Sequence, residues 1–213
     1  MLSFRNCSLL QYYLLNIAML VIGNGESRKH IDISKYDKIK VGCNAIFRDF
    51  YVNHLVCCDR RMVIEAQQTR NYGTIYTRPD WRDEFKPCGV VPKLPYKGND
   101  WTRPDDPWHW GSGAYALLLG ANLSQVFNKE PVVDIIGFDL YSDDKFVNNI
   151  YKNTKNYDAD THHSIDPSYW IYQAGKVFEH FPNIEFRNYN KNIWPDKYNN
   201  LTNYAVGDFN VGN

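Results

Sequence analysis

The chain has 213 residues, enough for one α/β domain that buries a sizeable core without disulfide bonds or a structural metal. Hydrophobic residues make up 44% of the sequence, as in an ordinary globular protein. Lysine plus arginine number 24, as do aspartate plus glutamate, so the formal net charge is zero. This balance argues against a protein that is drawn to nucleic acid by its overall charge.

The N-terminal segment is apolar between Leu9 and Ile22 but does not have the pattern of a membrane anchor. It is shorter than the ~20 apolar residues of a spanning helix, Gln11 and Asn16 interrupt it, and no small-residue cleavage site follows. We therefore expect no membrane partner and an N-terminal extension over residues 1–18. Met19 is a candidate natural start of the protein.

Short apolar runs alternate with helical patterns along the rest of the chain. The predicted strands are Met19–Ile22, Lys38–Cys43, Leu55–Cys58, Thr74–Tyr76, Val132–Phe138 and Ile184–Arg187. The predicted helices are Ser27–Ser34 with Ser27 as its cap, Arg61–Thr69, Ser112–Leu123 and Tyr169–Phe181. This alternation predicts a single Rossmann-like α/β domain over residues 19–190, with a mainly parallel sheet and helices on both faces.

Two long loops and a tail complete the predicted organisation. Residues 77–110 hold six of the ten prolines and four of the six tryptophans. Because long loops in compact domains are usually functional, we expect a lid there. Residues 142–168 form a second, polar loop with tyrosines and histidines. Residues 191–213 are rich in asparagine, and we expect an irregular C-terminal tail.

The cysteines indicate thiols rather than disulfides or a metal site. There are five, an odd number, and no C-x-x-C pair occurs. Cys43, Cys57 and Cys58 lie inside apolar runs, as expected of reduced core thiols in a cytoplasmic protein. No cysteine and histidine cluster has the spacing of zinc ligands, so we expect no metal.

Glycine and polar residues follow the predicted strands at their carboxyl ends, where parallel sheets bind ligands. We expect a nucleotide-linked ligand there. Backbone N–H groups at Gly23-Asn24-Gly25 could approach a phosphate, although a plain tight turn is the alternative. The candidate nucleotide-binding residues after the strands are Gly23, Asn24, Gly25, Ser27, Asn44, Asp59, Arg60 and Asp139. For Asn44 a capping role, and for Asp59 and Arg60 a surface ion pair, are the alternatives.

Further candidates lie at a helix start and in the second loop. Gly111, Ser112 and Gly113 open a predicted helix whose N–H groups could hold an anion, or Ser112 could simply cap it. His163 or its neighbour His162 is a candidate general base, with an ordinary surface histidine as the alternative. Tyr141 and Tyr151 are candidate catalytic donors to a leaving phosphate.

These segments, in this order, resemble the bacterial lipooligosaccharide sialyltransferases (glycosyltransferase family 42) and related motility-accessory glycosyltransferases. The resemblance rests on Val21-Ile-Gly-Asn-Gly-Glu-Ser27, Gly42-Cys-Asn44, Gly111-Ser-Gly-Ala-Tyr115, Asp134-Ile-Ile-Gly-Phe-Asp-Leu-Tyr141 and the His163-Ser164 pair. The chain departs from the family where Phe146-Val147 stands in place of a second tyrosine and Trp108-His-Trp-Gly111 in place of Arg-x-Thr. These departures leave the donor sugar open.

The resemblance implies a metal-independent transferase with a CMP-linked or related nucleotide-sugar donor and no separate cofactor. Asn24, Asn44, Ser112 and Gly113 would contact the nucleotide, Tyr141 the departing phosphate, and His163 would deprotonate the acceptor. The acceptor would be a glycan, a protein or a modified nucleic acid. The 15% of aromatic residues would also suit a homo-oligomer. The competing functions are a non-catalytic protein that sequesters a nucleotide and a Mg²⁺-dependent pyrophosphokinase-like enzyme.

Overall fold

A computed structural model describes residues 18–90, 110–142 and 144–211 of the chain. Most of the predicted N-terminal extension and residues 91–109 of the predicted lid therefore lie outside the described residues. Within the described residues, no helix is long and apolar enough to cross a membrane.

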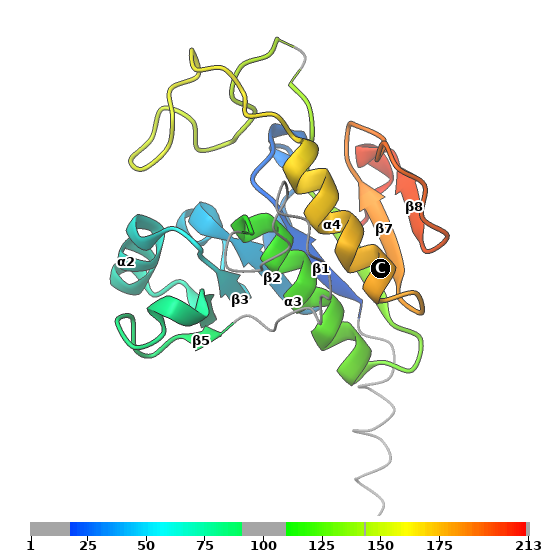
Figure 1. Cartoon of the computed structure of the whole chain (residues 1–213), viewed down its shortest axis with the longest axis horizontal. Coiled ribbons are helices and arrows are strands. Elements are labelled where there is room, and N and C mark those ends of the chain that lie inside the picture. Colours follow the sequence, from blue (N-terminus) through cyan, green and yellow to red (C-terminus); the bar gives the residue numbers. More distant parts are fainter. Residues whose placement is uncertain (1–17, 91–109, 143, 212–213) are drawn as a thin grey trace, which may run out of the picture.

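One eight-stranded, all-parallel sheet forms the centre of the molecule, in the order β5-β4-β3-β2-β1-β6-β7-β8 (Figure 1). This confirms the predicted Rossmann-like α/β fold. The strands are β1 Met19–Ile22, β2 Lys40–Cys43, β3 Val52–Val56, β4 Tyr72–Thr77, β5 Gly89–Val90, β6 Val132–Ile136, β7 Glu185–Tyr189 and β8 Leu201–Tyr204. All four residues of β1 are fully buried, because β1 has a neighbour on each side and layers on both faces.

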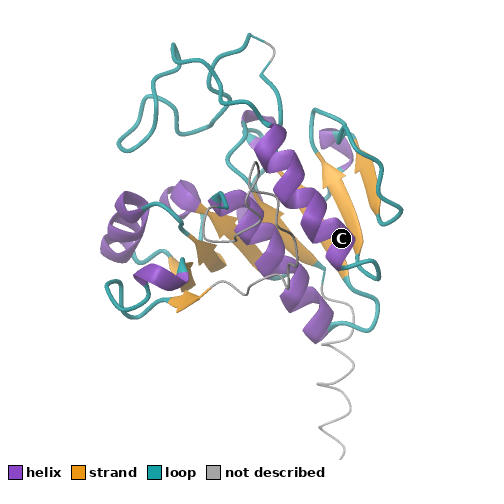
Figure 2. Ribbon diagram, in the orientation of Figure 1, coloured by secondary structure: helices purple, strands orange, loops and turns teal. Residues whose placement is uncertain are grey.

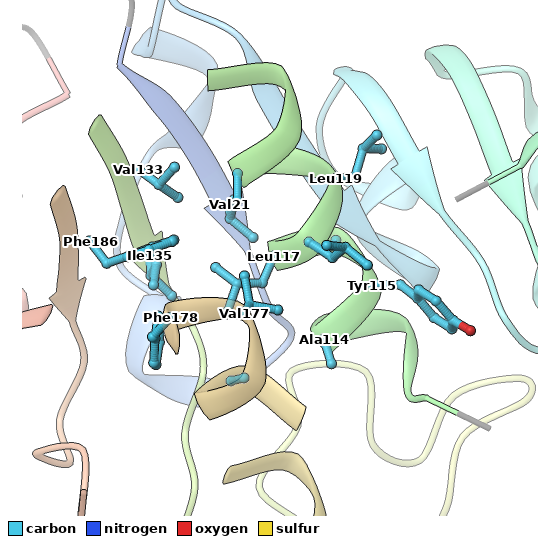
Figure 3. Close-up of a cluster of buried hydrophobic side chains, with 14 of the residues drawn as sticks. Val21, Ala114, Tyr115, Leu117, Leu119, Val133, Ile135, Val177, Phe178 and Phe186 are labelled. Atoms are coloured by element: carbon cyan, nitrogen blue, oxygen red, sulfur yellow. The ribbon is translucent and has the colours of Figure 1, made fainter. Parts of the chain in front are cut away.

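Helices cover both faces of this sheet (Figure 2). Helices α3 (Ser112–Phe127) and α4 (Ser168–His180) pack on one face. Val21, Leu117, Val177 and Phe178 meet in the core that these two helices share with the strands (Figure 3). Helix α2 (Arg60–Thr69) and the 3₁₀ helices η2 (Ile33–Lys35) and η3 (Asn44–Arg48) pack on the other face.

The C-terminal region differs from the prediction, since residues 201–204 form the edge strand β8 rather than an irregular tail. Asparagine side chains support it. Asn188 Nδ2 donates to Asn203 Oδ1 across β7 and β8 at 2.7 Å. Asn200 Nδ2 donates to the carbonyls of Phe178 and Phe181 at the end of α4. An asparagine-rich composition suggests a loop, but here the amides bond to neighbouring elements that the local pattern does not reveal.

The segment after β1 also differs from the prediction. Instead of one helix over 27–34 it forms two 3₁₀ turns, η1 (Glu26–Arg28) and η2. Ser27 does not cap a helix, because its Oγ is buried with no hydrogen-bond partner among the described residues. The strand that was predicted over Leu55–Cys58 is β3, which begins earlier, at Val52, and ends at Val56, two residues before the predicted end.

Candidate functional site

A pocket opens at the carboxyl ends of β1, β2 and β6, with a cavity volume of about 240 Å³. The strand order explains its place: β2 to β5 lie on one side of β1 and β6 to β8 on the other. The connections after β1 and β6 therefore diverge, and such divergence points form the binding crevices of open α/β sheets. The pocket brings together eight predicted residues: Gly23, Asn24, Gly25, Asn44, Gly111, Ser112, Gly113 and Asp139.

Two glycines let the turns after β1 and β6 touch at the pocket floor. A Cβ on Gly23 would lie 2.2 Å from the carbonyl oxygen of Gly137, so only glycine fits there. Gly137 itself has φ +68°, a left-handed conformation that glycine adopts readily. The N–H of Gly23 donates to the carbonyl of Ile136, and that of Gly25 to the carbonyl of Gly137. The two turns thus form one hydrogen-bonded unit.

Four N–H groups of the glycine turn, those of Gly23, Gly25, Glu26 and Ser27, donate to acceptors of the protein and so do not hold a phosphate as predicted. The N–H of Ser27 donates to Asp139 Oδ2 at 2.8 Å, and the N–H of Glu26 donates to Asn148 Oδ1 at 2.9 Å. A carboxylate and an amide from loops far along the chain therefore satisfy the start of η1. The predicted residues Gly23 and Gly25 shape the pocket floor, whereas Ser27 does not line the pocket.

Arg28 lies under this floor and is only 2% exposed. Its Nε donates to the carbonyl of Gly23 at 2.6 Å, and its Nη2 donates to Asn24 Oδ1 at 3.4 Å and to the Tyr151 hydroxyl at 3.1 Å. These partners are all neutral oxygens. Tyr151 in turn donates to Asp49 Oδ2 at 2.7 Å, so that carboxylate is one hydrogen bond removed from the guanidinium. A buried cation thus raises the electrostatic potential of the pocket floor.

Asn24 and Asn44 present amides from neighbouring strand ends. Asn24 Nδ2 donates to the Cys43 carbonyl at 3.3 Å and to the Tyr157 hydroxyl at 3.2 Å. Asn44 has φ +48°, a left-handed conformation that asparagine tolerates better than most residues. Asn44 Oδ1 is buried without a hydrogen-bond partner among the described residues, as are Asp139 Oδ1 and Trp194 Nε1 in the same lining. Buried polar atoms are normally paired, so these three are exceptions, and each is enclosed by protein rather than open to the cavity.

Helix α3 begins at the opposite wall of the pocket. Gly111 is its N-cap residue and provides no side-chain cap, and Ser112 Oγ instead accepts a hydrogen bond from the Cys58 N–H at 2.9 Å. That bond fixes the helix start against the end of β3. The N–H groups of Ser112, Gly113 and Ala114 belong to the first turn, which has no intrahelical acceptors. They line the pocket at the positive end of a 16-residue helix, which favours an anion.

The remaining predicted residues do not line the pocket. Asp59 accepts a hydrogen bond from the Arg61 N–H and caps α2, and Arg60 pairs with Glu84 on the surface. Tyr141 is 49% exposed. His163 is exposed and stacks on Phe146, with ring centroids 5.5 Å apart. Tyr151 is buried below the pocket floor, where its hydroxyl accepts a hydrogen bond from Arg28 and donates one to Asp49. It therefore supports the pocket from beneath.

Sequence reasoning missed several residues of this region. Arg28 occupies the third glycine position of the dinucleotide-binding pattern G-x-G-x-x-G that begins at Gly23 and Gly25. This departure was the only feature of the sequence that pointed to Arg28. Phe138 lies between the glycine turn and the start of α3, 3.6 Å from where a Cβ on Gly113 would be. Asn148, Trp170 and Trp194 reach the pocket from the second loop, from α4 and from the C-terminal region, without a recognisable motif.

The thiols near the pocket are not suited to nucleophilic chemistry. Burial raises the pKa of Cys43, which lines the pocket, to about 12, and burial likewise raises the pKa of Cys58 to about 12. Both therefore remain protonated at neutral pH. Among the described residues, no group of three histidine, cysteine or acidic side chains is placed to hold a metal ion.

A scan against known protein families, a search of curated proteins and a search of solved structures each find no match to this chain.

Proposed function

We propose that this chain binds a nucleotide-linked sugar in the pocket and transfers the sugar to an acceptor hydroxyl without a metal ion. One observation carries the proposal: the start of α3 and the residues Asn24, Asn44 and Asp139 line the same cavity. A nucleotide needs both kinds of partner. Its phosphate accepts hydrogen bonds from a helix start, and its ribose and base donate hydrogen bonds to amide or carboxylate oxygens.

The electrostatics of the pocket suit a leaving phosphate. Glycosyl transfer places negative charge on the departing phosphate, and preorganised donors at that point lower the barrier. The first-turn N–H groups of α3 and the buried Arg28 would supply that stabilisation. The departing phosphate would then be neutralised by the protein itself, as the resemblance to the sialyltransferases implies.

The acceptor needs a base, and two residues compete for that role. His163 is the candidate from the resemblance, but it lies outside the pocket lining. Asp139 lines the pocket, and its Oδ1 has no partner within the described residues while Oδ2 holds the Ser27 N–H. A transfer or donor-hydrolysis assay of His163→Ala and Asp139→Asn would separate them, because only loss of the base lowers turnover with donor affinity retained.

A second function is favoured by the positions of Tyr141 and His163. Because both lie outside the pocket lining, the site is also consistent with a protein that binds the nucleotide without turnover. In that case the donor would bind, but neither hydrolysis nor transfer would occur at any enzyme concentration tested.

The first experiment is a thermal-shift and calorimetric screen of CMP, CMP-N-acetylneuraminate, UDP, UDP-sugars, GDP-sugars and ATP, with chelator and with Mg²⁺. A ligand that binds only the native state raises the melting temperature. We expect a nucleotide or its sugar conjugate to bind in chelator. Binding of ATP alone, and only with Mg²⁺, would instead favour the pyrophosphokinase-like function. No binding by any of these ligands would overturn the proposal.

Gly113→Ala is a matched site variant for the same screen. A Cβ on Gly113 would meet Phe138 at an ordinary contact distance of 3.6 Å, so the fold should accept it. The added methyl group would occupy space at the start of α3, and we expect it to weaken nucleotide binding about tenfold or more without lowering the melting temperature. Gly207→Ala is the control, because nothing lies within 4 Å of its Cβ position.

A further inference from the structure

Trp170 stands at the mouth of the pocket with an exposed indole. It lies in the first turn of α4, lines the pocket and is 40% exposed, whereas Trp194 in the same lining is only 3% exposed. Ala174, one helical turn further along α4, also lines the pocket. An aromatic ring that is part wall and part solvent-exposed is unusual for a core residue and typical of a contact surface.

The indole lies directly beside the proposed phosphate position. Its Nε1 is 3.4 Å, and its Cδ1 3.6 Å, from where a Cβ on Gly111 would be, and Gly111 is the N-cap of α3. Gln173 of α4 accepts a hydrogen bond from the Gly111 N–H at 3.1 Å, which holds the two helices together at this point. A group joined to a phosphate at the start of α3 therefore has Trp170 as its neighbour.

The described lining holds no cation that would pair with a second negative charge on the ligand. Its one charged side chain is Asp139, an acid, and the buried Arg28 lies beneath the floor on the glycine-turn side, where it bonds to the Gly23 carbonyl. Within the described lining, Gly111 lies beside the indole, and Ala174 lies one helical turn along α4 from Trp170. An apolar flat surface of this kind suits the C–H face of an uncharged pyranose better than a sugar carboxylate.

We infer that Trp170 is the stacking surface for the donor sugar, and that this sugar is an uncharged pyranose rather than a sialic acid. The inference rests on the proposed function and adds the sugar class and the residue that selects it. Trp170 would contact the sugar but not the nucleotide, so it would contribute to the affinity of a nucleotide-sugar and not to that of the free nucleotide.

The test compares pairs of ligands on matched variants by calorimetry. The pairs are UDP with UDP-glucose and UDP-N-acetylglucosamine, GDP with GDP-mannose, and CMP with CMP-N-acetylneuraminate. The variants are Trp170→Ala, Trp170→Phe, which retains a flat ring, and Ile165→Ala. Ile165 is 67% exposed, lies three residues before α4 and does not line the pocket, so it controls for loss of surface apolar area.

We expect the wild type to bind a nucleotide that carries an uncharged sugar. Trp170→Ala should weaken its binding about fivefold to tenfold and that of the free nucleotide less than about twofold, with Trp170→Phe between the two. Equal weakening of both ligands would mean that the indole contacts the base or only supports the fold, and would overturn the inference. So would an unchanged affinity, or tight binding of CMP-N-acetylneuraminate alone. If the wild type bound neither member of any pair, the proposed function would fail first, and the inference with it.

Discussion

The floor of the pocket and the outer part of the 142–168 loop are built in opposite ways. In the floor, Arg28, Asn24 and Tyr151 are buried and joined to one another and to the glycine turn. In the outer loop, residues 145–147 and 162–164 pair through one isolated antiparallel bridge between Phe146 and His163, and this pair of segments, here called the outer ladder, carries His163 on its exposed surface. This loop projects beyond the end of the sheet at which the strands terminate (Figure 1).

The contrast shows which kind of residue each region can offer. The floor fixes the shape and potential of the pocket, since its polar groups are desolvated and paired. Five of the six residues of the outer ladder are exposed, so water surrounds most of its side chains. Under the proposed function, donor-binding residues therefore belong to the floor and walls of the pocket, and the outer ladder is left to face the acceptor.

Gly23→Ala should have the largest effect, because it breaks the floor itself. The new Cβ would overlap the Gly137 carbonyl oxygen, a backbone atom that cannot move without separating β1 from β6. We expect the free energy of unfolding to fall by about 3 kcal/mol or more, as for other overpacked core positions. Urea denaturation measures this, with Gly207→Ala as the control that should change stability by less than about 0.5 kcal/mol. Equal stability of the two variants would show that the turns are not in contact.

Tyr151→Phe should have the next largest effect, and it tests the reassignment of this residue. Loss of the hydroxyl removes the shorter of the two hydrogen bonds of Arg28 Nη2, which keeps only Asn24 Oδ1 at 3.4 Å, and it removes the link from Arg28 to the exposed carboxylate of Asp49. We expect unfolding to become easier by about 2 kcal/mol. Tyr141→Phe, at an exposed side chain, should leave stability unchanged. If instead Tyr151→Phe kept full stability and lost only turnover, Tyr151 would be catalytic and the structural role described here would be wrong.

Much of the floor was predictable from the sequence because its signals are local. The short apolar run of β1 followed by Gly23 and Gly25 predicts a buried strand and a tight turn, and both are present. The acceptor to which each N–H group of the glycine turn donates was not predictable. Asp139 and Asn148 lie more than a hundred residues from the N–H groups that they satisfy, and no pattern near Ser27 indicates them. Strand β8 was missed for the same reason, since its asparagines find partners on β7 and α4.

The outer loop was the least predictable region. The His163-Ser164 pair and Tyr141 matched a family pattern, but a pattern does not specify where a loop side chain points. Trp170 had no motif, and its exposure at the pocket mouth follows from how α4 packs against the start of α3. Strand ends and glycines in the sequence therefore indicated where the pocket lies, whereas the lining residues that depend on helix packing were missed.

Glu65→Gln should lower stability by a smaller amount that depends on pH. It acts on residues 154–156 of the 142–168 loop, which are hydrogen-bonded to Arg48 and Glu65. Glu65 pairs with Arg48, which also donates to Thr154 Oγ1 and to the Lys155 carbonyl. The hydrogen bond from Arg48 lowers the pKa of Glu65. The unfolded chain therefore takes up this proton first as the pH falls, so the stability that the pair contributes is present above about pH 4.5 and is lost below it.

At pH 7 we expect Glu65→Gln to be less stable than the wild type by about 1 kcal/mol and to be cut faster by protease between residues 150 and 160. Urea denaturation across pH 3.5 to 7 checks the sign, since the difference between the two proteins should shrink as the pH falls through 4.5. A difference that grew toward acid pH would mean that the carboxylate is not held by Arg48 in the folded state.

His163→Ala should have the smallest effect on binding, and it decides whether the outer ladder belongs to the site. The imidazole stacks on Phe146 outside the pocket lining, so its removal should change nucleotide affinity by less than about twofold and stability by less than about 0.5 kcal/mol. Calorimetry with the tightest nucleotide and urea denaturation measure the two quantities, and Phe146→Ala controls for loss of the stacked pair. If turnover fell while binding was unchanged, the ladder would have to reach the acceptor during the reaction. If His163→Ala weakened nucleotide binding more than tenfold, the histidine would contact the donor, and the division between a binding floor and a separate outer loop would be incorrect.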